Sequence, residues 1–352
     1  MAKIRVRLAS EEDEGAWNHF IRRYGGSVYH AYEWRRVLER GCGYRCYYLV
    51  AEEGGEMRGV LPIATLGRLL ARGLSSLPMS DYGGPVLAGR GGGRRVLEAL
   101  LSAARRLAGG RGLEVRSPVQ ARVRRYLREQ ASAASYKYVT FLIRLASSFN
   151  HMWRKVFNKY LRNEIRKPMK HGIEVRVGSF PSLGRYFYRL YLMSMRRLGS
   201  PPHGLKFFRA CREELGDGRV RIFLAVKEGV PVAAVLTLLH GRTIYPAYEG
   251  VDPAYRRLNP VSLIFSEMIR WGCEHGFSTF DFGRTLYGTS VFSYKKKWGG
   301  ELRVQPYYYL WRGRPRRDPR EKHAFLPGLW RKLARGPLHE LAGSFLKAEL
   351  GY

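Results

Sequence analysis

An internal repeat limits the fold of this sequence more than any other feature. Residues 26–30 (GSVYH), followed by Trp34, are echoed by residues 199–203 (GSPPH), followed by Phe207. Motifs that recur in the same order in both halves of a chain predict two structural units of the same kind, because each repeat encodes one supersecondary unit. The repeat therefore argues against a single large domain with an unrelated chain path.

The segments that follow these motifs also correspond. Residues 48–54 and 59–63 in the first half match residues 223–229 and 233–237 in the second half. In each half, two runs of strand-forming residues are separated by a short turn that contains glycine. This pattern predicts one β-hairpin in each unit.

Each half then continues with a helix and a strand. The helical periodicity of residues 94–108 leads through glycine into a strand at residues 113–116. In the second half, the periodicity of residues 261–275 leads into a strand at residues 278–282. Each unit thus reads helix, hairpin, strand, helix, strand.

This order of elements predicts an α/β (α+β) fold with three parts. We expect a first unit over residues 1–145, a second unit over residues 150–310 and a basic amphipathic tail over residues 311–352. The crease between two paired units is a common place for a ligand to bind.

Composition narrows the class of protein further. Lys and Arg number 62 against 29 Asp and Glu, which gives a formal net charge of +33, and 45% of the residues are hydrophobic. So much apolar sequence excludes a disordered basic protein, whereas the charge favours polyanionic partners. Without an apolar run of 18 residues or an export signal, we expect a cytoplasmic protein with no transmembrane segment. The four scattered cysteines predict reduced thiols and no metal site.

The densest group of motifs lies near the end of the second unit. Residues 280–285 (FDFGRT), 288–290 (GTS) and 292–301 (FSYKKKWGGE) resemble the C-terminal signature of the FemAB-like proteins, the tandem-GNAT aminoacyl and acyl transferases. In the first half, His30, Trp34 and the glycine-rich segments after them fall in the family order. The resemblance covers about residues 15–310 and points to the subgroup without a long helical arm.

The resemblance implies two tandem GNAT-like units, that is, the acyl-CoA N-acyltransferase fold. It also implies an N-acyltransferase that moves an aminoacyl or acyl group to an amine on a phosphate-bearing or cell-envelope-related acceptor. No cofactor is expected to stay bound, and the donor substrate is either aminoacyl-tRNA or acyl-CoA.

Positive charge is needed where the oxyanion of an acyl transfer forms, and Lys295 and Arg284 can supply it. By resemblance, Tyr294 and Lys295 match the aromatic–lysine pair that faces the acyl-bearing end of the donor. The alternative is that residues 295–297 form a solvated charge run before an edge strand.

Three carboxylates at strand ends are candidates for a general base. Asp81 and Glu249 occupy corresponding places in the two units, and Asp281 lies within the signature. We rank Asp81 and Glu249 as catalytic candidates, with the alternative that each is a structural cap or ion-pair partner. An amine can also enter already neutral or lose its proton to water or substrate, and a reaction without a protein base is therefore the other alternative.

The remaining site predictions concern substrate binding. We assign Trp34, Tyr82, Gly83, Tyr248 and Tyr294 to this role from their places in the family order and in the repeat. 

Residues 150–171 contain seven Lys or Arg and one Glu. On a helix, Arg162, Arg166 and Lys170 share one face, beside Lys167, and the resemblance indicates contacts of this face with a phosphorylated substrate or tRNA. The alternative is a solvated surface helix.

Two loops correspond to the pyrophosphate loop of acetyl-CoA-binding proteins. Residues 90–93 resemble a degraded form of this loop at a helix N-terminus. Residues 256–262 contain no glycine, and Pro260 removes an amide donor, which disfavours ordinary CoA binding in the second unit.

Two further predictions follow from the charge. The amphipathic tail can contact an anionic membrane at its inner face, or it can pack on its own domain. A second class of function is a non-catalytic RNA-binding protein that uses arginine for phosphates and aromatic side chains for stacking.

Overall fold

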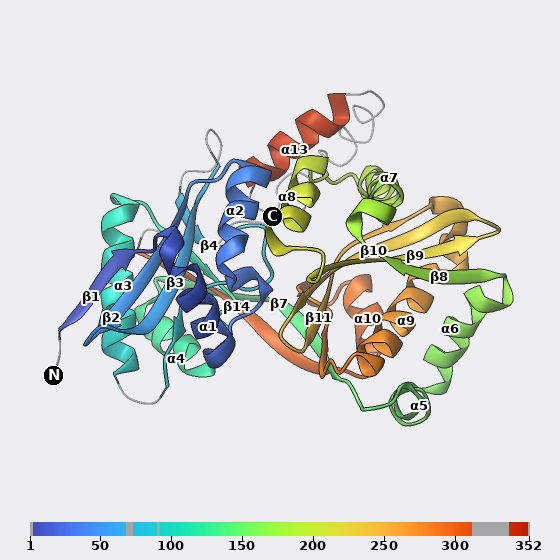
Figure 1. Ribbon diagram of the computed structural model, residues 1–352, viewed down its shortest axis with the longest axis horizontal. Coiled ribbons are helices and arrows are strands. Elements are labelled where there is room, and N and C mark those ends of the chain that lie inside the picture. The colour runs from blue at the N-terminus through green and yellow to red at the C-terminus, as the bar shows by residue number, and fades with distance from the viewer. Residues whose placement is uncertain (1–2, 68–72, 90–91, 312–337, 351–352) are drawn as a thin grey trace.

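The computed structural model describes residues 3–67, 73–89, 92–311 and 338–350. The chain forms two lobes that lie side by side, with the N-terminus at the outer end of the first lobe (Figure 1). In these ranges no helix is long and apolar enough to cross a membrane.

The first unit contains seven strands and four α-helices among its described residues. In chain order they are β1 (Ile4–Leu8), α1 (Glu14–Tyr24), α2 (Tyr32–Cys42), β2 (Cys46–Glu53), β3 (Glu56–Leu66), β4 (Gly73–Ser76), β5 (Val86–Leu87), α3 (Gly93–Ala108), β6 (Leu113–Arg116), α4 (Ala121–Gln130) and β7 (Ala133–Arg144).

The second unit begins with a short helical turn and a basic helix. Its elements are α5 (Phe149–His151), α6 (Lys159–Lys170), β8 (Ile173–Gly178), α7 (Phe180–Leu198), α8 (Leu205–Leu215), β9 (Val220–Lys227), β10 (Val230–His240), β11 (Thr243–Val251), α9 (Pro260–Glu274), β12 (Thr279–Asp281), β13 (Thr285–Leu286), α10 (Ser290–Lys296) and β14 (Glu301–Leu310). In the tail, α13 covers Leu338–Leu350.

The two units repeat the predicted order of elements. In the first unit, α2, the β2–β3 hairpin, β4, α3 and β6 follow one another, and α8, the β9–β10 hairpin, β11, α9 and β12 correspond to them. The strand at residues 113–116 and both long helices lie where the periodicity places them. The structure therefore confirms the predicted α/β fold.

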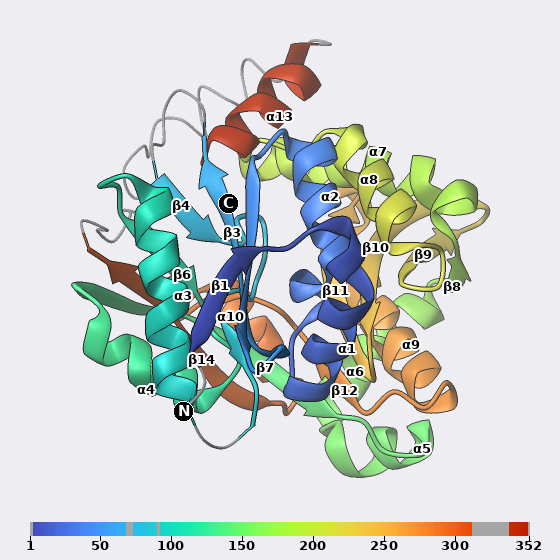
Figure 2. The same ribbon diagram turned by 60° about the vertical axis from the view of Figure 1, so that its left-hand side comes forward.

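The long helix of the first unit shows why periodicity is informative here. On α3, Val96, Leu97, Leu100 and Ala104 are buried, and their spacing of three or four residues forms one apolar stripe. This stripe packs against the hairpin and β1, while α4 lies on the same side of the sheet (Figure 2). The helix ends at Gly109, whose φ of +54° suits a left-handed cap.

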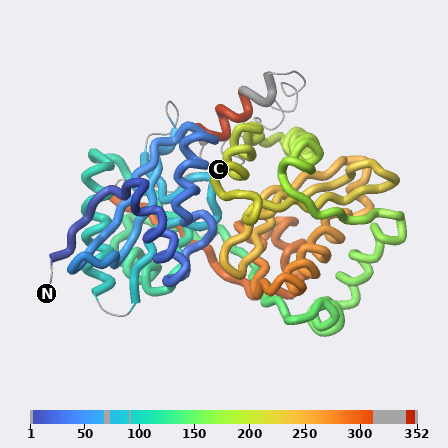
Figure 3. The backbone as a smooth tube through the Cα atoms, viewed as in Figure 1, coloured from blue at the N-terminus to red at the C-terminus, as the bar shows by residue number. Residues whose placement is uncertain are grey.

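The described strands form one 14-stranded sheet that runs through both units. Its order is β1-β2-β3-β4-β6-β14-β7-β12-β11-β10-β9-β8, with β5 beside β3 and β13 beside β7. The last strand of each unit enters the other unit, because β14 pairs with β6 and β7 pairs with β12. Figure 3 shows the late, orange-red part of the chain passing back into the first lobe. The units are thus joined by exchanged strands.

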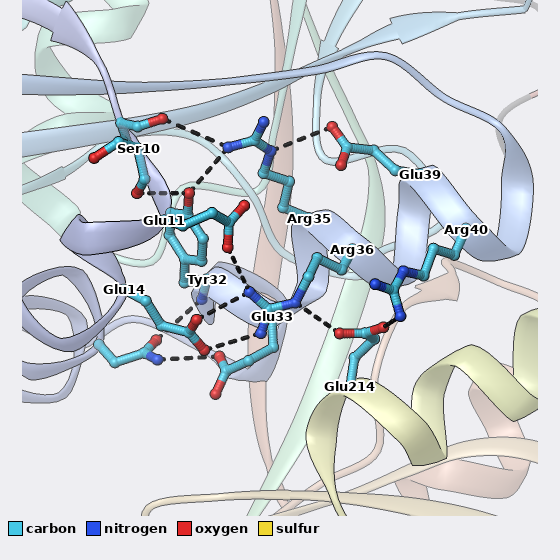
Figure 4. A network of polar contacts seen from close by, with 12 residues as sticks. Ser10, Glu11, Glu14, Tyr32, Glu33, Arg35, Arg36, Glu39, Arg40 and Glu214 are labelled. Atoms are coloured by element: carbon cyan, nitrogen blue, oxygen red, sulfur yellow. Dashed lines mark hydrogen bonds and ion pairs between the residues drawn. The ribbon is translucent and has the colours of Figure 1, made fainter.

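The repeated helices α2 and α8 pack against each other where the lobes meet. Trp34 and Phe207, which correspond in the repeat, make an edge-to-face contact with ring centroids 6.3 Å apart. On the polar side, Arg36 of α2 binds Glu14 of α1 at 2.9 Å and Glu214 of α8 at 2.6 Å (Figure 4). A hydrophobic cluster with residues from both units lies beneath these helices.

Candidate active site

The signature residues leave the sheet where two strands of the second unit diverge. β11 pairs in parallel with β12 only at Thr243–Thr279 and Ile244–Phe280, although β11 continues to Val251. On its other side, β12 pairs with β7 of the first unit. The ends of β11 and β12 therefore separate next to residues from the first unit.

Asp281, at the end of β12, is held by three donors. The Tyr82 hydroxyl donates to Oδ2 at 2.6 Å, while the Thr140 hydroxyl at 2.7 Å and the Gly283 amide at 2.9 Å donate to Oδ1. Burial raises the pKa of Asp281, and the three hydrogen bonds act in the opposite direction. With both oxygens bonded, Asp281 orders this turn and ties Tyr82 of the first unit to the second.

Asp81 reaches the same turn from the first unit. A Cβ atom on Gly283 would lie 2.4 Å from Asp81 Oδ2, and Gly283 has a φ of +67°, so only glycine suits this position. The Tyr29 hydroxyl donates to Asp81 Oδ2 at a long 3.3 Å. Compared with Asp281, the Asp81 carboxylate has free capacity to accept a proton or a hydrogen bond from a substrate.

Lys295 stands on α10 and points back to this turn. Its ammonium donates to Thr285 Oγ1 at 2.6 Å, to the Phe282 carbonyl at 2.7 Å and to the Gly283 carbonyl at 3.3 Å. The side chain is therefore not part of a solvated charge run, unlike the exposed Lys296 beside it.

Lys295 and three carboxylates form one electrostatic group. Burial lowers the pKa of Lys295, whereas Asp81, Glu249 and Asp281 raise it by a smaller amount. Desolvation by the surrounding protein raises the pKa of the Glu249 carboxyl, against the opposing effect of Lys295 and Arg197, although the residue as a whole is exposed. The site thus combines an ammonium that loses its proton more easily than usual with a carboxyl that holds its proton more tightly.

Arg284 is fixed at the edge of this group. Its Nη1 donates to the Tyr307 hydroxyl at 2.5 Å, and its guanidinium lies 5.1 Å from the ring centroid of Tyr138. Burial lowers the pKa of Arg284, but Tyr307 and Asp81 outweigh this effect and the pKa is raised. Arg284 therefore contributes a permanent positive charge held by residues of the exchanged strands.

Tyr294 belongs to a chain of polar contacts at the start of α9. Its hydroxyl lies 3.0 Å from Ser262 Oγ, and the Ser262 hydroxyl donates to Glu164 Oε1 at 2.7 Å. Lys297 forms an ion pair with the same Glu164 carboxylate and lies 4.5 Å from the Tyr294 ring centroid. The aromatic member of the predicted aromatic–lysine pair is thus anchored to α6 and α9.

The other residues assigned to substrate binding lie deeper in the protein. Trp34 is fully buried, and its Nε1 donates to Ser80 Oγ at 2.9 Å, which fixes the loop that carries Asp81. Tyr248 packs edge-on against His203 at a centroid distance of 5.2 Å. Gly83 permits the loop to approach β4, since a Cβ atom there would lie 2.2 Å from the Ser76 carbonyl oxygen.

The basic residues of α6 lie away from the Lys295 group. Arg162 donates to the Phe157 carbonyl at 2.7 Å, and Lys167 donates to the Arg257 carbonyl at 2.6 Å. Arg166 covers the Trp153 ring at 5.2 Å. Together with Lys170 they form a basic surface beside the start of α9, and α6 reaches the site through its single carboxylate, that of Glu164.

A cavity of about 1020 Å³ lies behind the loop that carries Asp81. Met79 of this loop lines it, together with the ends of α2 and α8 and with α13, which crosses above both helices (Figure 1). Arg45, Arg111 and Lys206 also line the cavity, and none of the three has an ion-pair partner in the described part of the chain. Its lining is therefore partly apolar and partly charged, and these cations, with Arg40, outnumber the two carboxylates, Glu39 and Glu349.

Two sequence predictions concern residues beyond the described ranges. Arg90 and Gly91 of the first pyrophosphate-like loop lie outside the described residues, as does the part of the tail from 312 to 337. Among the described residues, no three His, Cys, Asp or Glu side chains are arranged to hold a metal ion.

The structure adds contacts that the sequence did not indicate. Tyr29 binds Asp81, Thr140 binds Asp281 and Thr285 binds Lys295. Tyr29 and Thr285 lie within the motifs 26–30 and 280–285, but their contacts were not predicted, and Thr140 belongs to no motif. Glu164 could have been singled out from the sequence, because it is the single acidic residue within the basic run 150–171.

The fold of the chain is similar to that of acyltransferases of the GNAT fold. The family model described as "Acetyltransferase (GNAT) domain" matches residues 155–296. The crystal structure of FemX is similar with a TM-score of 0.67 and 14% identity, covering 92% of this chain and 100% of that chain. A tandem GNAT protein from the clavulanic acid biosynthesis pathway is similar with a TM-score of 0.57 and 12% identity, covering 89% of this chain and 100% of that one.

Sequence and structure comparisons together support the FemAB-like assignment. A UDP-N-acetylmuramoylpentapeptide-lysine N(6)-alanyltransferase from Weissella viridescens is 25% identical over 122 residues, which is 35% of this chain and 36% of that relative. The C-terminal domain of a putative lysylphosphatidylglycerol synthetase from Agrobacterium fabrum has a TM-score of 0.58 at 10% identity, over 92% of this chain and 96% of that chain. By sequence and by fold, the chain is thus similar to FemAB-like proteins of tandem GNAT fold, in line with its signature residues.

Proposed function

We propose that this protein is an N-acyltransferase that moves an aminoacyl or acyl group to an amine on a phosphate-bearing, cell-envelope-related acceptor. The observation that carries the proposal is the meeting of Lys295 with Asp81 and Glu249 where β11 and β12 diverge. A half-buried cation beside solvent-accessible carboxylates suits acyl transfer, which develops negative charge on oxygen and releases a proton from nitrogen.

The reaction forms one bond and breaks one. The acceptor amine attacks the carbonyl carbon of the donor ester, the new C–N bond forms, and the C–O bond to the donor breaks. Lys295 stabilises the oxyanion of the tetrahedral intermediate, exchanging one of its three hydrogen bonds at the turn for this oxygen. The proton lost by the amine goes to Asp81 or Glu249, and this carboxyl returns a proton to the departing oxygen, which leaves as the hydroxyl of the donor.

The names of the relatives support the acceptor class. The Weissella viridescens relative is a transferase of alanine to a UDP-linked muramoyl peptide, and the Agrobacterium fabrum neighbour is named for lysylphosphatidylglycerol. Both names join an amino acid to a phosphate-bearing molecule. The cationic lining of Arg45, Arg111 and Lys206 makes the cavity behind Asp81 a suitable place for such an acceptor.

We place the enzyme in the cytoplasm, with aminoacyl-tRNA as its donor and the basic face of α6 as a contact for tRNA phosphates. The tail adds a peripheral contact with anionic membrane, and its described helix α13 exposes Phe345 beside the basic cavity rim.

Transfer by the purified full-length chain tests this proposal. The lysine-containing UDP-muramoyl pentapeptide is the acceptor, alanyl-tRNA and acetyl-CoA are offered separately, and mass spectrometry detects the acylated product. We expect product with alanyl-tRNA and its loss in Asp81→Asn combined with Glu249→Gln. Absence of product from either donor, together with equal and steeply salt-dependent binding of charged and uncharged tRNA, would instead identify an RNA-binding protein.

A further inference from the structure

A carboxylate of the chain stands where this fold exposes a helix N-terminus to a donor phosphate. We propose that Glu164 is a specificity-determining residue that closes the second unit to CoA and leaves the site to a donor that lacks the CoA pyrophosphate. The proposal rests on the proposed function for the class of donor, whereas the contacts of Glu164 do not depend on that function.

The first step concerns the start of α9. Asn259 precedes this helix with a φ of +57°, Pro260 has no amide hydrogen, and the Ser262 amide donates to the Asn259 carbonyl at 3.0 Å. Few backbone amides therefore remain for a pyrophosphate, although the positive end of the helix dipole still favours an anion.

The second step concerns the anion that is present. The Glu164 carboxylate accepts a hydrogen bond from the Ser262 hydroxyl in the first turn of α9 at 2.7 Å and forms an ion pair with Lys297. The chain thus supplies its own negative charge at this helix end. A pyrophosphate brought here would meet a fixed negative charge and would lose Lys297 as a ligand unless Glu164 moved.

The third step concerns the surroundings that hold Glu164. Its side chain is only 19% exposed, and Lys167, one turn further along α6, binds the Arg257 carbonyl in the loop before α9 at 2.6 Å. The helix and the loop before α9 are therefore tied together beside Glu164. Because Ser262 also contacts the Tyr294 hydroxyl at 3.0 Å, the same carboxylate fixes the residue next to Lys295.

Binding of CoA, measured by titration calorimetry with the full-length chain, tests the proposal without any transfer reaction. We expect weak binding of CoA to the natural protein and at least tenfold tighter binding to Glu164→Ala, in which Lys297 and the Ser262 hydroxyl are free to bind phosphate. Glu164→Gln keeps the shape of the side chain and guards against a folding defect, and it should show part of the gain.

Glu174→Ala is the matched control, because it also removes one negative charge, but from an exposed pair with Arg176 on β8. A gain in Glu164→Ala that Glu174→Ala does not show supports the proposal. Tight CoA binding by the natural protein, or equal affinities in the Glu164 and Glu174 variants, would overturn it. Transfer from alanyl-tRNA is assayed separately, so that failure of the proposed function is recognised independently of this result.

Discussion

The two units share a fold but use the corresponding strand ends in opposite ways. In the first unit, β4 (Gly73–Ser76) stays paired with β6 up to its last residue, with Leu74 to Ser76 opposite residues 113–115. In the second unit, β11 leaves β12 after two pairs and makes room for the Lys295 group. The same order of elements is therefore found with strands that stay paired to the end in one unit and with strands that diverge in the other.

The polar residues at the closed end neutralise one another. Arg116 and Glu114 on β6 form an ion pair at 2.6 Å with side-chain exposures of 2% and 6%, and the Ser75 hydroxyl lies 3.4 Å from the same carboxylate. In the first unit, the ends of β4 and β6 therefore do not form an open site. The loop that carries Asp81 and Tyr82 instead contacts the second unit. The corresponding strand ends of the two units therefore have different roles: the one in the first unit is structural, and the one in the second unit carries the Lys295 group.

Removal of Arg116 tests the structural end and should have the largest effect. Arg116→Met removes an ion-pair partner of the buried Glu114, so we expect the free energy of unfolding to fall by about 3–5 kcal/mol. Chemical denaturation measures it. Arg303→Met is the control, because its pair with Glu301 is exposed on β14 and should contribute less than about 1 kcal/mol. Similar losses in both variants would contradict the contrast between buried and exposed pairs.

Removal of Lys295 tests the reactive end. Lys295→Met should lower the rate constant of transfer by roughly 10²–10³, because a cation at the developing oxyanion is lost. Lys296→Met, which changes the exposed neighbour, should retain most of the activity. Single-turnover transfer with alanyl-tRNA measures both. A loss confined to the melting temperature, with a normal rate constant, would assign Lys295 to the structure of the turn alone.

Local sequence patterns were sufficient for the repeated elements but not for helices such as α4 and α7 between them, nor for the pairing of the strands. The stripe of α3 and the strand 113–116 follow from periodicity because each is encoded by adjacent residues. The exchange of β7 and β14 brings Tyr307 opposite Arg116, and no local pattern encodes a partner that far away along the chain. The order of the strands in the middle of the sheet could therefore not be predicted from the sequence.

The same reason limits what the sequence reveals of the site. Lys295 was recognised because its motif is contiguous, whereas the close approach of Asp81 to Gly283 depends on how two distant loops fold together. Trp34 was assigned to a substrate, but its full burial and its bond to Ser80 only emerge once α2 packs against α8.

Gly283 tests the contact between the two units directly. In Gly283→Ala the new Cβ atom meets Asp81 Oδ2, so we expect the loop to shift and the rate constant to fall by about 10²-fold, in line with a displacement of 1 Å. Gly288→Ala is the control: its φ of +77° brings similar backbone strain, about 1–2 kcal/mol, but no atom lies within 4 Å of the added Cβ. Equal activities in the two variants would mean that the position of Asp81 is unimportant for transfer.

The pH dependence of transfer should show the smallest effect and tells which unit supplies the base. A base acts in its deprotonated form, so transfer by Glu249 rises with pH through its pKa, and the raised pKa moves this rise above the usual range of glutamate. Because the pKa of Lys295 is lowered, its ammonium loses its charge at a lower pH than an ordinary lysine does. The decline of the transfer rate at high pH therefore begins earlier. In Glu249→Gln the rise at low pH should disappear or move by about one unit, whereas Glu274→Gln, an exposed residue at the end of α9, should leave the profile unchanged. If the rise persists in Glu249→Gln and is removed by Asp81→Asn, the base comes from the first unit, and the second unit contributes only the cation.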